Sequence, residues 1–162
     1  MTLHKAYIGL GSNLESPEKQ IASAIQELQA HPELHNIRAS KCYRSKPLAE
    51  MAQPDYINAV VELNTHLSAE RLLDELQAIE DSHKRDRTTG RWSARTLDLD
   101  ILLYAKQTIK TERLTVPHYG LKDRDFVIIP LAELDPNLKL PDNTKINDLV
   151  TQCSTEGLSR IE

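Results

Sequence analysis

The sequence is poor in aromatic residues and cysteines, and it has no long apolar run. Aromatic residues make up 4% of the chain, and the two cysteines, Cys42 and Cys153, form no C-x-x-C pair. This pattern predicts ordinary reduced thiols of a cytoplasmic protein. No apolar segment approaches the ~18 residues that a membrane helix needs, and the N-terminus lacks a signal-peptide pattern. We therefore expect a cytoplasmic protein that makes no membrane contact.

Positive charge is not in excess either. The formal net charge is −4, whereas domains that bind polyanions in general carry a surplus of Lys and Arg. Any affinity for phosphates must therefore come from a local cluster. The chain has no G-x-x-x-x-G-K-[ST] phosphate loop, and residues 9–14 lack the third glycine of a dinucleotide fingerprint. The six histidines show no metal-ligand spacing, which argues against a zinc site.

The order of the predicted elements indicates an α+β fold. The composition, with 40% hydrophobic residues, and the length of 162 residues predict one globular domain over residues 1–162. Strands are predicted at residues 6–10, 37–43, 56–65 and 95–104, with helices starting after the capping residue types Ser16 and Ser68. This βαββαβ order is typical of a ferredoxin-like antiparallel sheet with helices on one face. Short helices at 127–134 and 146–152 would form a C-terminal extension.

Two acids interrupt the apolar strand RTLDLDILLY (95–104). Side chains alternate along a strand, so Asp98 and Asp100 should share one face, while Leu97, Leu99, Ile101 and Leu103 take the other. Carboxylates ~7 Å apart on one strand face can jointly hold hard cations such as Mg²⁺, completed by water and substrate phosphates. The alternative is that both acids pair with arginines on a solvated face.

A basic segment, HKRDRTTGRWSAR (83–95), runs directly into this strand. Its cations outnumber the single acid Asp86, and it holds the only tryptophan, Trp92; the cations are Lys84, Arg85, Arg87, Arg91 and Arg95. Cations beside two carboxylates suit a polyphosphate that a metal ion bridges. Two alternatives are a solvated charge run and a nucleic-acid patch with Trp92 as a stacking platform. The net acidic charge and low aromatic content weigh against the latter.

Five stretches resemble the 6-hydroxymethyl-7,8-dihydropterin pyrophosphokinase family. They are YIGLGSNL (7–14), YRSKPL (43–48), QPDYINAVVEL (53–63), RTLDLDILLY (95–104) and TERLTVPHYGLKDRDFVIIPL (111–131). They span nearly the whole chain in the family's order, and R-T-L-D-L-D-I followed by V-P-H is highly specific. The resemblance implies a Mg²⁺-dependent enzyme of folate biosynthesis that transfers the pyrophosphoryl group of ATP to the hydroxymethyl group of the reduced pterin and releases AMP. It also implies a ferredoxin-like monomer with two Mg²⁺ and no nucleic-acid partner.

The same resemblance implies roles for individual residues. Asp98 and Asp100 would bind both magnesium ions, and Arg85 and Arg95 would be the catalytic arginines. The pterin pocket would comprise Gly11, Ser45, Pro47, Leu48, Tyr56, Asn58, Trp92 and Phe126. The residues around ATP would be Glu80, Arg87, Arg113, Thr115, His118, Tyr119, Lys122 and Arg124.

The chemistry of a pterin agrees with this assignment. A flat, amide-like heterocycle suits two stacking rings, Trp92 and Phe126, and an amide such as Asn58 that offers a donor and an acceptor. From the residues alone, Phe126 can equally fill the core, and Asn58 can satisfy a backbone group.

The chain departs from the family where W-S-A-R (92–95) replaces the usual W-G-P-R. Ala94 leaves free the φ angle that proline would fix, which predicts a larger entropic cost of ordering this loop. Two alternatives to the pyrophosphokinase stay open at this stage. One is a paralogue that acts on another pterin, and the other is a ferredoxin-like module that binds RNA.

Overall fold

The computed structural model describes residues 3–13, 16–45, 56–83, 97–153 and 158–161. In chain order the elements are β1 (His4–Ser12), α1 (Pro17–Ala30), β2 (Leu34–Ala39), β3 (Cys42–Ser45), β4 (Tyr56–Thr65), α2 (Ala69–His83), β5 (Leu97–Tyr104), β6 (Ile109–Lys110), β7 (Thr115–Val116), the 3-10 helix η1 (Leu121–Asp123), α3 (Asp125–Leu134), α4 (Ile146–Val150) and β8 (Leu158–Ile161). Within these residues, no helix has both the length and the apolar character needed to cross a membrane.

One antiparallel sheet organises the molecule. Its strands follow the order β5-β1-β4-β3-β8, β2 also pairs with β4, and β6 and β7 form a separate hairpin. Strands β1, β4 and β5, with β2 and β3 together in the place of the motif's second strand and α1 and α2 as crossovers, have the βαββαβ connectivity expected from the sequence. The ferredoxin-like α+β fold is therefore confirmed.

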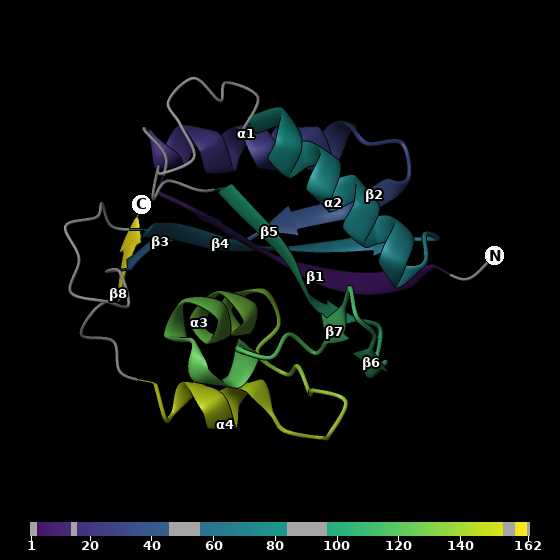
Figure 1. The fold of residues 1–162 in the computed structure, drawn as a ribbon. Coiled ribbons are helices and arrows are strands. Elements are labelled where there is room, and N and C mark those ends of the chain that lie inside the picture. Colours follow the sequence, from purple (N-terminus) through teal and green to yellow (C-terminus); the bar gives the residue numbers. More distant parts are fainter. Residues whose placement is uncertain (1–2, 14–15, 46–55, 84–96, 154–157, 162) are drawn as a thin grey trace.

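Helices cover both faces of the sheet (Figure 1). On one face, Leu28 of α1 and Leu72 of α2 pack against Ile8 of the sheet. On the other, α3 and α4 form a second cluster, in which Ile128 and Leu131 of α3 are buried. The expectation of helices on one face alone is wrong because α3 is strongly apolar, and burial of its side chains against the sheet is favourable. The C-terminal extension is thus a second layer of the domain.

The segment predicted as one strand at 37–43 forms two strands. They are separated at Ser40, whose hydroxyl accepts a hydrogen bond from the Val60 amide at 2.9 Å. At this point the Val60 amide therefore bonds to a side-chain oxygen, where a regular strand pair would offer a backbone carbonyl. The predicted short helices are present, although α3 begins at Asp125 and α4 ends at Val150.

The two predicted helix caps have different outcomes. Ser68 caps α2, because its Oγ accepts the Arg71 amide at 3.2 Å. Ser16 does not cap α1 through its side chain. It adopts a left-handed conformation with φ 56°, and its carbonyl accepts the amides of Lys19 and Gln20 instead.

Strand β5 contains one irregularity that changes which residues face α3. Ile101 pairs with Ile8 but Leu103 pairs with Tyr7, so Leu102 is an extra residue at this point. As a result Leu102 and Leu103 both join the α3 cluster. The prediction that Leu103 faces the opposite side is therefore wrong. The alternation holds for Asp98 and Asp100, which precede the irregularity.

Candidate active site

A row of residues crosses the α3 face of the sheet at one end. Asp98 on β5 pairs with Gly11 on β1, Gly11 pairs with Asn58 on β4, and Asn58 pairs with Tyr43 on β3. Residues directly opposite one another in a ladder share a face. The register therefore places a carboxylate, a residue without a side chain, an amide and a phenol side by side.

Two glycines of β1 pair with the carboxylates of β5, but only Gly11 borders the Asn58 amide. Gly9 pairs with Asp100 as Gly11 pairs with Asp98. Among the described residues, a Cβ at Gly11 would have Asn58 Oδ1 alone within 4 Å, at 3.1 Å, whereas a Cβ at Gly9 would press on Leu102 at 3.2 Å. The G-x-G run lies wholly within β1, although the predicted strand ended at residue 10, before Gly11. Gly9 was not among the predicted site residues, and its contact with Leu102 assigns it to the core.

Asn58 is buried and oriented by a neighbour from β3. Its Nδ2 donates to Ser45 Oγ at 2.7 Å, and its Oδ1 faces Gly11, 3.1 Å from the position that a Cβ there would take. The possibility that Asn58 serves only to satisfy a backbone group is therefore not supported. Tyr56 pairs with Ser45, one step further toward the end of the sheet. Gly11, Ser45, Tyr56 and Asn58 thus lie together, as predicted.

The carboxylates of β5 alternate with buried leucines. Asp98 and Asp100 are partly exposed, while Leu97 and Leu99 are buried on the other face. Burial raises the pKa of the Asp100 carboxyl, and the nearby Asp98 charge raises it further, whereas His118 and Arg124 act in the opposite direction. Of the described residues, His118 forms the ion-pair contact with Asp100, at 3.8 Å between Nε2 and Oδ2.

These two carboxylates fit a hard divalent cation. They are oxygen donors on one strand face, and the raised pKa of Asp100 shows that negative charge is unfavourable there without a counter-cation. The described part of the chain holds no group of three or more metal-ligating side chains. A cation would therefore need further oxygens from water or a bound phosphate, as Mg²⁺ commonly does.

The stability of the metal-free protein tests this electrostatic account. A pKa raised in the folded state contributes stability below the ordinary value of 3.8, and that contribution is lost as pH rises through the folded value. Ionised Asp100 therefore lowers stability at pH 7. We expect Asp100→Asn to raise the melting temperature in EDTA by about 1 to 3 °C at pH 7, and the gain to shrink toward pH 4. A variant less stable than wild type at pH 7 would contradict the account.

His118 is fixed with a defined ring orientation. Its backbone amide donates to the Leu102 carbonyl, and its Nδ1 accepts the Gly120 amide, both at 3.0 Å. When the ring is neutral, the proton therefore lies on Nε2, the nitrogen that faces Asp100. Burial lowers the pKa of His118, while Asp100 opposes this change.

Arg124 lies between two aromatic rings beside the carboxylates. Its Cζ is 5.5 Å from the Tyr119 ring centre and 5.8 Å from that of Phe126. Tyr119 stacks on His118 at 4.6 Å and is 77% exposed. A Cβ at Gly120 would lie 2.5 Å from Arg124 Nε, so a side chain at this position would require the Arg124 guanidinium to move. His118, Tyr119, Arg124 and Phe126 thus form one cationic and aromatic group, which brings three residues predicted for ATP next to one predicted for the pterin.

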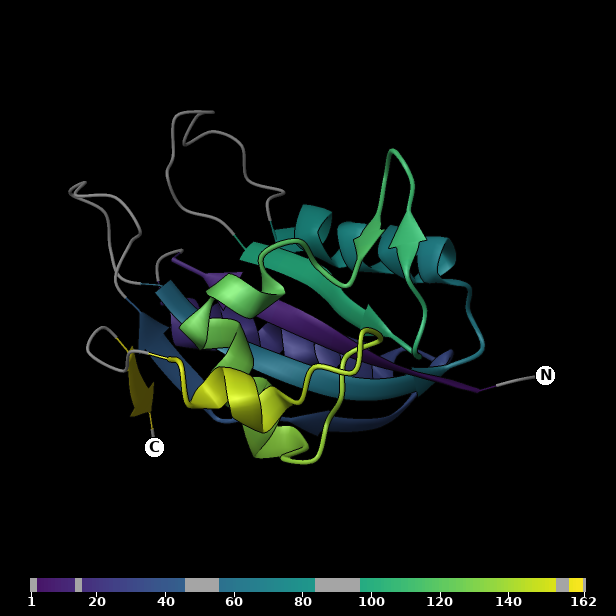
Figure 2. The same ribbon diagram turned by 90° about the horizontal axis from the view of Figure 1, so that it is seen from below.

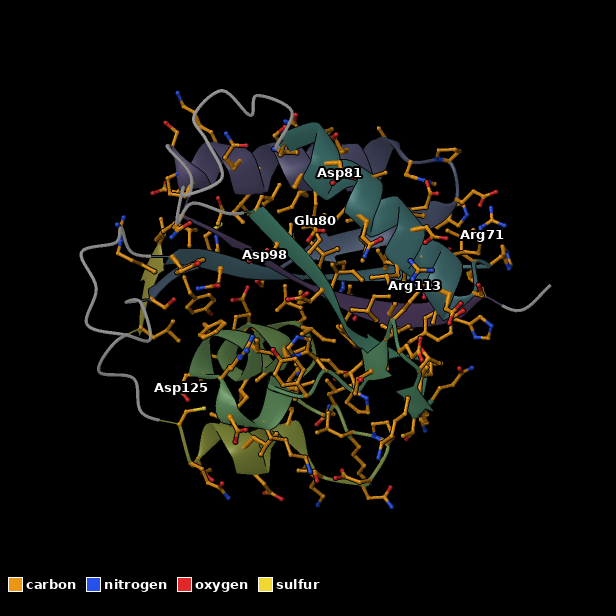
Figure 3. The ribbon with its side chains drawn as sticks, viewed as in Figure 1. Arg71, Glu80, Asp81, Asp98, Arg113 and Asp125 are labelled. Carbon is orange, nitrogen blue, oxygen red and sulfur yellow. The ribbon has the colours of Figure 1, made fainter. Side chains whose placement is uncertain are left out.

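The Glu80 side chain of α2 contacts the backbone of β5, the strand that carries Asp98 and Asp100. Its Oε2 accepts the Leu99 amide at 2.7 Å, and Figure 3 shows Glu80 of α2 beside Asp98. Leu99 is the residue between the two aspartates, and among the described strands β5 forms the edge of the sheet, where outward amides lack a neighbouring strand. Glu80 was predicted to lie at ATP, and the structure shows that its carboxylate holds β5.

Of the other predicted ATP residues in the described part of the chain, two form ion pairs of their own and one is exposed. Arg113 pairs with Asp74 of α2 at 2.6 Å, and Figure 3 shows it well separated from Asp98. Lys122 pairs with Asp142 at 2.5 Å, which holds the pKa of the Asp142 carboxyl well below its usual range. Thr115 is exposed on β7.

Several predicted residues lie outside the described part of the chain. They are Pro47, Leu48, Arg85, Arg87, Trp92 and Arg95, together with the W-S-A-R departure at 92–95. The catalytic arginines and one stacking ring of the pterin pocket therefore stay predictions.

Comparison with known proteins identifies the family of the chain. The sequence profile of 7,8-dihydro-6-hydroxymethylpterin-pyrophosphokinase matches residues 7–136. The chain is similar to the 2-amino-4-hydroxy-6-hydroxymethyldihydropteridine pyrophosphokinase of Haemophilus influenzae, with 49% identity over 96% of this chain and 97% of that one. It is also similar to the enzyme of the same name from Pseudomonas aeruginosa, with 43% identity over 98% of both chains.

A solved structure shares the fold. The Plasmodium falciparum HPPK-DHPS protein in complex with pteroate superposes with a TM-score of 0.74 at 14% identity, over 93% of this chain. The chain spans 42% of that longer protein. At this identity the match supports the fold alone, whereas the profile and the close bacterial relatives establish the family. The chain belongs to the 7,8-dihydro-6-hydroxymethylpterin-pyrophosphokinase family.

Proposed function

We propose that the row from Asp98 through Gly11 to Asn58 is where this enzyme of folate biosynthesis holds its two substrates. The enzyme transfers the pyrophosphoryl group of ATP to the hydroxymethyl group of 6-hydroxymethyl-7,8-dihydropterin and releases AMP. The observation that carries the placement is the ladder register, which sets two carboxylates and a buried amide on either side of a glycine floor. Phosphates would lie over β5, and the pterin over β1 and β4.

Asp98 and Asp100 would hold two Mg²⁺ on the ATP phosphates. When bound, these ions would neutralise phosphate charge and orient the reacting groups. The two carboxylates fix the ions to a strand whose position is set by Glu80 at the Leu99 amide. Rigid attachment of this kind is valuable because phosphoryl-type transfer depends mainly on positioning and charge stabilisation.

The cationic and aromatic group of His118, Tyr119, Arg124 and Phe126 would contact the phosphates and the edge of the pterin. Arg124, held between Tyr119 and Phe126, supplies positive charge near Asp100. His118 presents Nε2 toward the same place. By the resemblance, Arg85 and Arg95 would add charge as the transition state forms, and Arg87, Arg113, Thr115 and Lys122 would contact ATP.

Asn58 and Phe126 would recognise the pterin. Oδ1 of Asn58 is an acceptor facing the space above Gly11, and it suits the N–H donors of an amino-pteridine edge. Phe126 is partly buried at the start of α3 and offers one ring face. By the resemblance, Trp92, Pro47 and Leu48 would complete the pocket.

A pair of glycine substitutions tests where the pterin lies. We expect Gly11→Ala to weaken pterin binding by roughly tenfold or more, because the added methyl fills the floor 3.1 Å from Asn58 Oδ1. Gly9→Ala is the matched control, since its methyl would press on Leu102 inside the core. That variant should lose stability but keep pterin affinity. Titration calorimetry and thermal melts separate the two effects, and equal affinity losses in both variants would refute the placement.

The reaction itself is tested by incubating the pure protein with ATP, Mg²⁺ and the hydroxymethyl pterin. AMP and the pterin pyrophosphate should form in equal amounts, and neither should form when EDTA is added. Release of ADP, or no product, would refute the proposal.

The comparisons give no support to an RNA-binding module or to a paralogue acting on another pterin. We further propose that residues 1–162 act as one cytoplasmic, monomeric domain without a nucleic-acid partner.

A further inference from the structure

Helix α3 crosses the face of the sheet, with its N-terminal end toward β5 and its C-terminal end over β2 and β3 (Figure 2). Its N-terminal end carries Phe126 and follows Arg124, whose charge acts on Asp100. Its C-terminal end, at Glu133 and Leu134, lies against β2 and β3. The helix therefore connects two places on the sheet that lie several strands apart.

The C-terminal end of α3 is held by a set of short hydrogen bonds. The Tyr43 hydroxyl donates to Glu133 Oε1 at 2.6 Å, and the Lys41 amide donates to Glu133 Oε2 at 2.8 Å. Nearby, Arg38 Nη2 donates to the Leu134 carbonyl at 2.8 Å. Both oxygens of Glu133 are thus used, and Tyr43 is only 6% exposed.

The same residues lie next to the proposed pterin pocket. Tyr43 pairs with Asn58 and shares a strand face with Ser45, two residues further along β3. On α3, Glu133 follows Phe126 by seven residues, which places both on one face of the helix, about 10 Å apart along its axis. The Tyr43–Glu133 bond therefore joins the strand that carries one wall of the pocket to the helix that carries another.

The first turns of α3 lack one internal constraint. Pro130 lies inside the helix and has no N–H, so it cannot bond the Phe126 carbonyl. The position of Phe126 over the sheet therefore depends more on how the remainder of the helix is held. Apolar packing fixes the depth of α3 on the sheet, but such packing is non-directional, whereas the bonds of Glu133 specify one position along it.

We propose that Tyr43 and Glu133 are positioning residues for the pterin. Their hydrogen bond sets the spacing between Phe126 on α3 and the Asn58–Ser45 pair on the sheet, without contact between their own polar groups and the substrate. This inference rests on the proposed function, in which those residues bind the pterin.

Tyr43→Phe tests the inference, because it removes only the hydroxyl and keeps the ring. We expect the Kd for the pterin to rise roughly three- to tenfold, while the Kd for Mg²⁺ with α,β-methylene-ATP changes less than about twofold, within the range of an unaffected site. In steady state, KM for the pterin should rise more than kcat falls. Glu133→Gln retains one acceptor oxygen in place of two and should show the same pattern.

Tyr7→Phe is the matched control. The Tyr7 hydroxyl likewise donates to a carboxylate, that of Glu62, at 3.1 Å, but both residues belong to the sheet, on β1 and β4. This variant should lose stability as Tyr43→Phe does, yet keep pterin affinity. A pterin Kd unchanged in Tyr43→Phe, or raised equally in both variants, would overturn the inference.

Asn58→Ala separates this inference from the proposed function. If Asn58→Ala leaves pterin binding intact, the proposed pocket is wrong, and the positioning role is wrong with it. If Asn58→Ala weakens binding while Tyr43→Phe behaves like Tyr7→Phe, the pocket stands and only the positioning role is refuted. Should Glu133→Gln fail to fold, the comparison of Tyr43→Phe with Tyr7→Phe still decides whether Tyr43 has the positioning role.

Discussion

Replacing Asp98 or Asp100 by alanine should reduce turnover by about 10³-fold or more, because each carboxylate fixes a cation on the transferring phosphates. The fold should stay intact, since both side chains are partly exposed and removal of one relieves repulsion between them. The measurement is kcat at saturating Mg²⁺, together with a thermal melt in EDTA.

Asp81→Ala is the control for the carboxylate variants. Asp81 is an exposed acid in the same region of α2 as Glu80, but it is not part of the proposed site. Its variant should keep the wild-type rate. Near wild-type turnover in either Asp98→Ala or Asp100→Ala at saturating Mg²⁺ would show that these residues do not hold the metal.

Arg85→Ala and Arg95→Ala should reduce the rate of the chemical step by about 10³-fold or more, and should weaken ATP binding much less. An arginine that contacts the phosphates mainly in the transition state contributes to kcat and little to ground-state affinity. Single-turnover rates measure the first effect, and titration with α,β-methylene-ATP measures the second.

Arg71→Ala, a change of an exposed arginine near the start of α2, is the control and should alter neither quantity. A collapse of ATP affinity with an unchanged chemical step would reassign Arg85 and Arg95 to ground-state binding. Loss of both quantities would be consistent with a role in both states, and would refute the prediction that they act mainly in the transition state.

The part of the site that the sequence predicts best depends on strand alternation. Asp98 and Asp100 share a face because the period of a strand is two residues, and the structure confirms it. Gly11 and Asn58 enter through the family resemblance, and the ladder then places them beside Asp98. Strand alternation and the family resemblance together are therefore sufficient to predict that Asp98, Gly11 and Asn58 belong to the site.

The features that were missed depend on contacts between distant segments. The extra residue at Leu102 depends on how β5 pairs with β1, and nothing in LLY distinguishes it locally. The hydrogen bond from Tyr43 to Glu133 joins residues 90 positions apart. The two residues meet because α3 crosses the sheet over β3. The backbone role of Glu80 likewise requires α2 to lie against the edge of β5. Such contacts are set by tertiary packing, which propensities and periodicity do not specify.

Magnesium-dependent nucleotide binding is the most direct test of the proposed site. Titration calorimetry of the wild type with α,β-methylene-ATP should show strong binding with Mg²⁺ and little in EDTA, and Asp98→Asn and Asp100→Asn should abolish the difference. Asp81→Asn should behave as wild type. Equal binding with and without Mg²⁺ in the wild type, or an unchanged magnesium dependence in both Asp98→Asn and Asp100→Asn, would contradict the account.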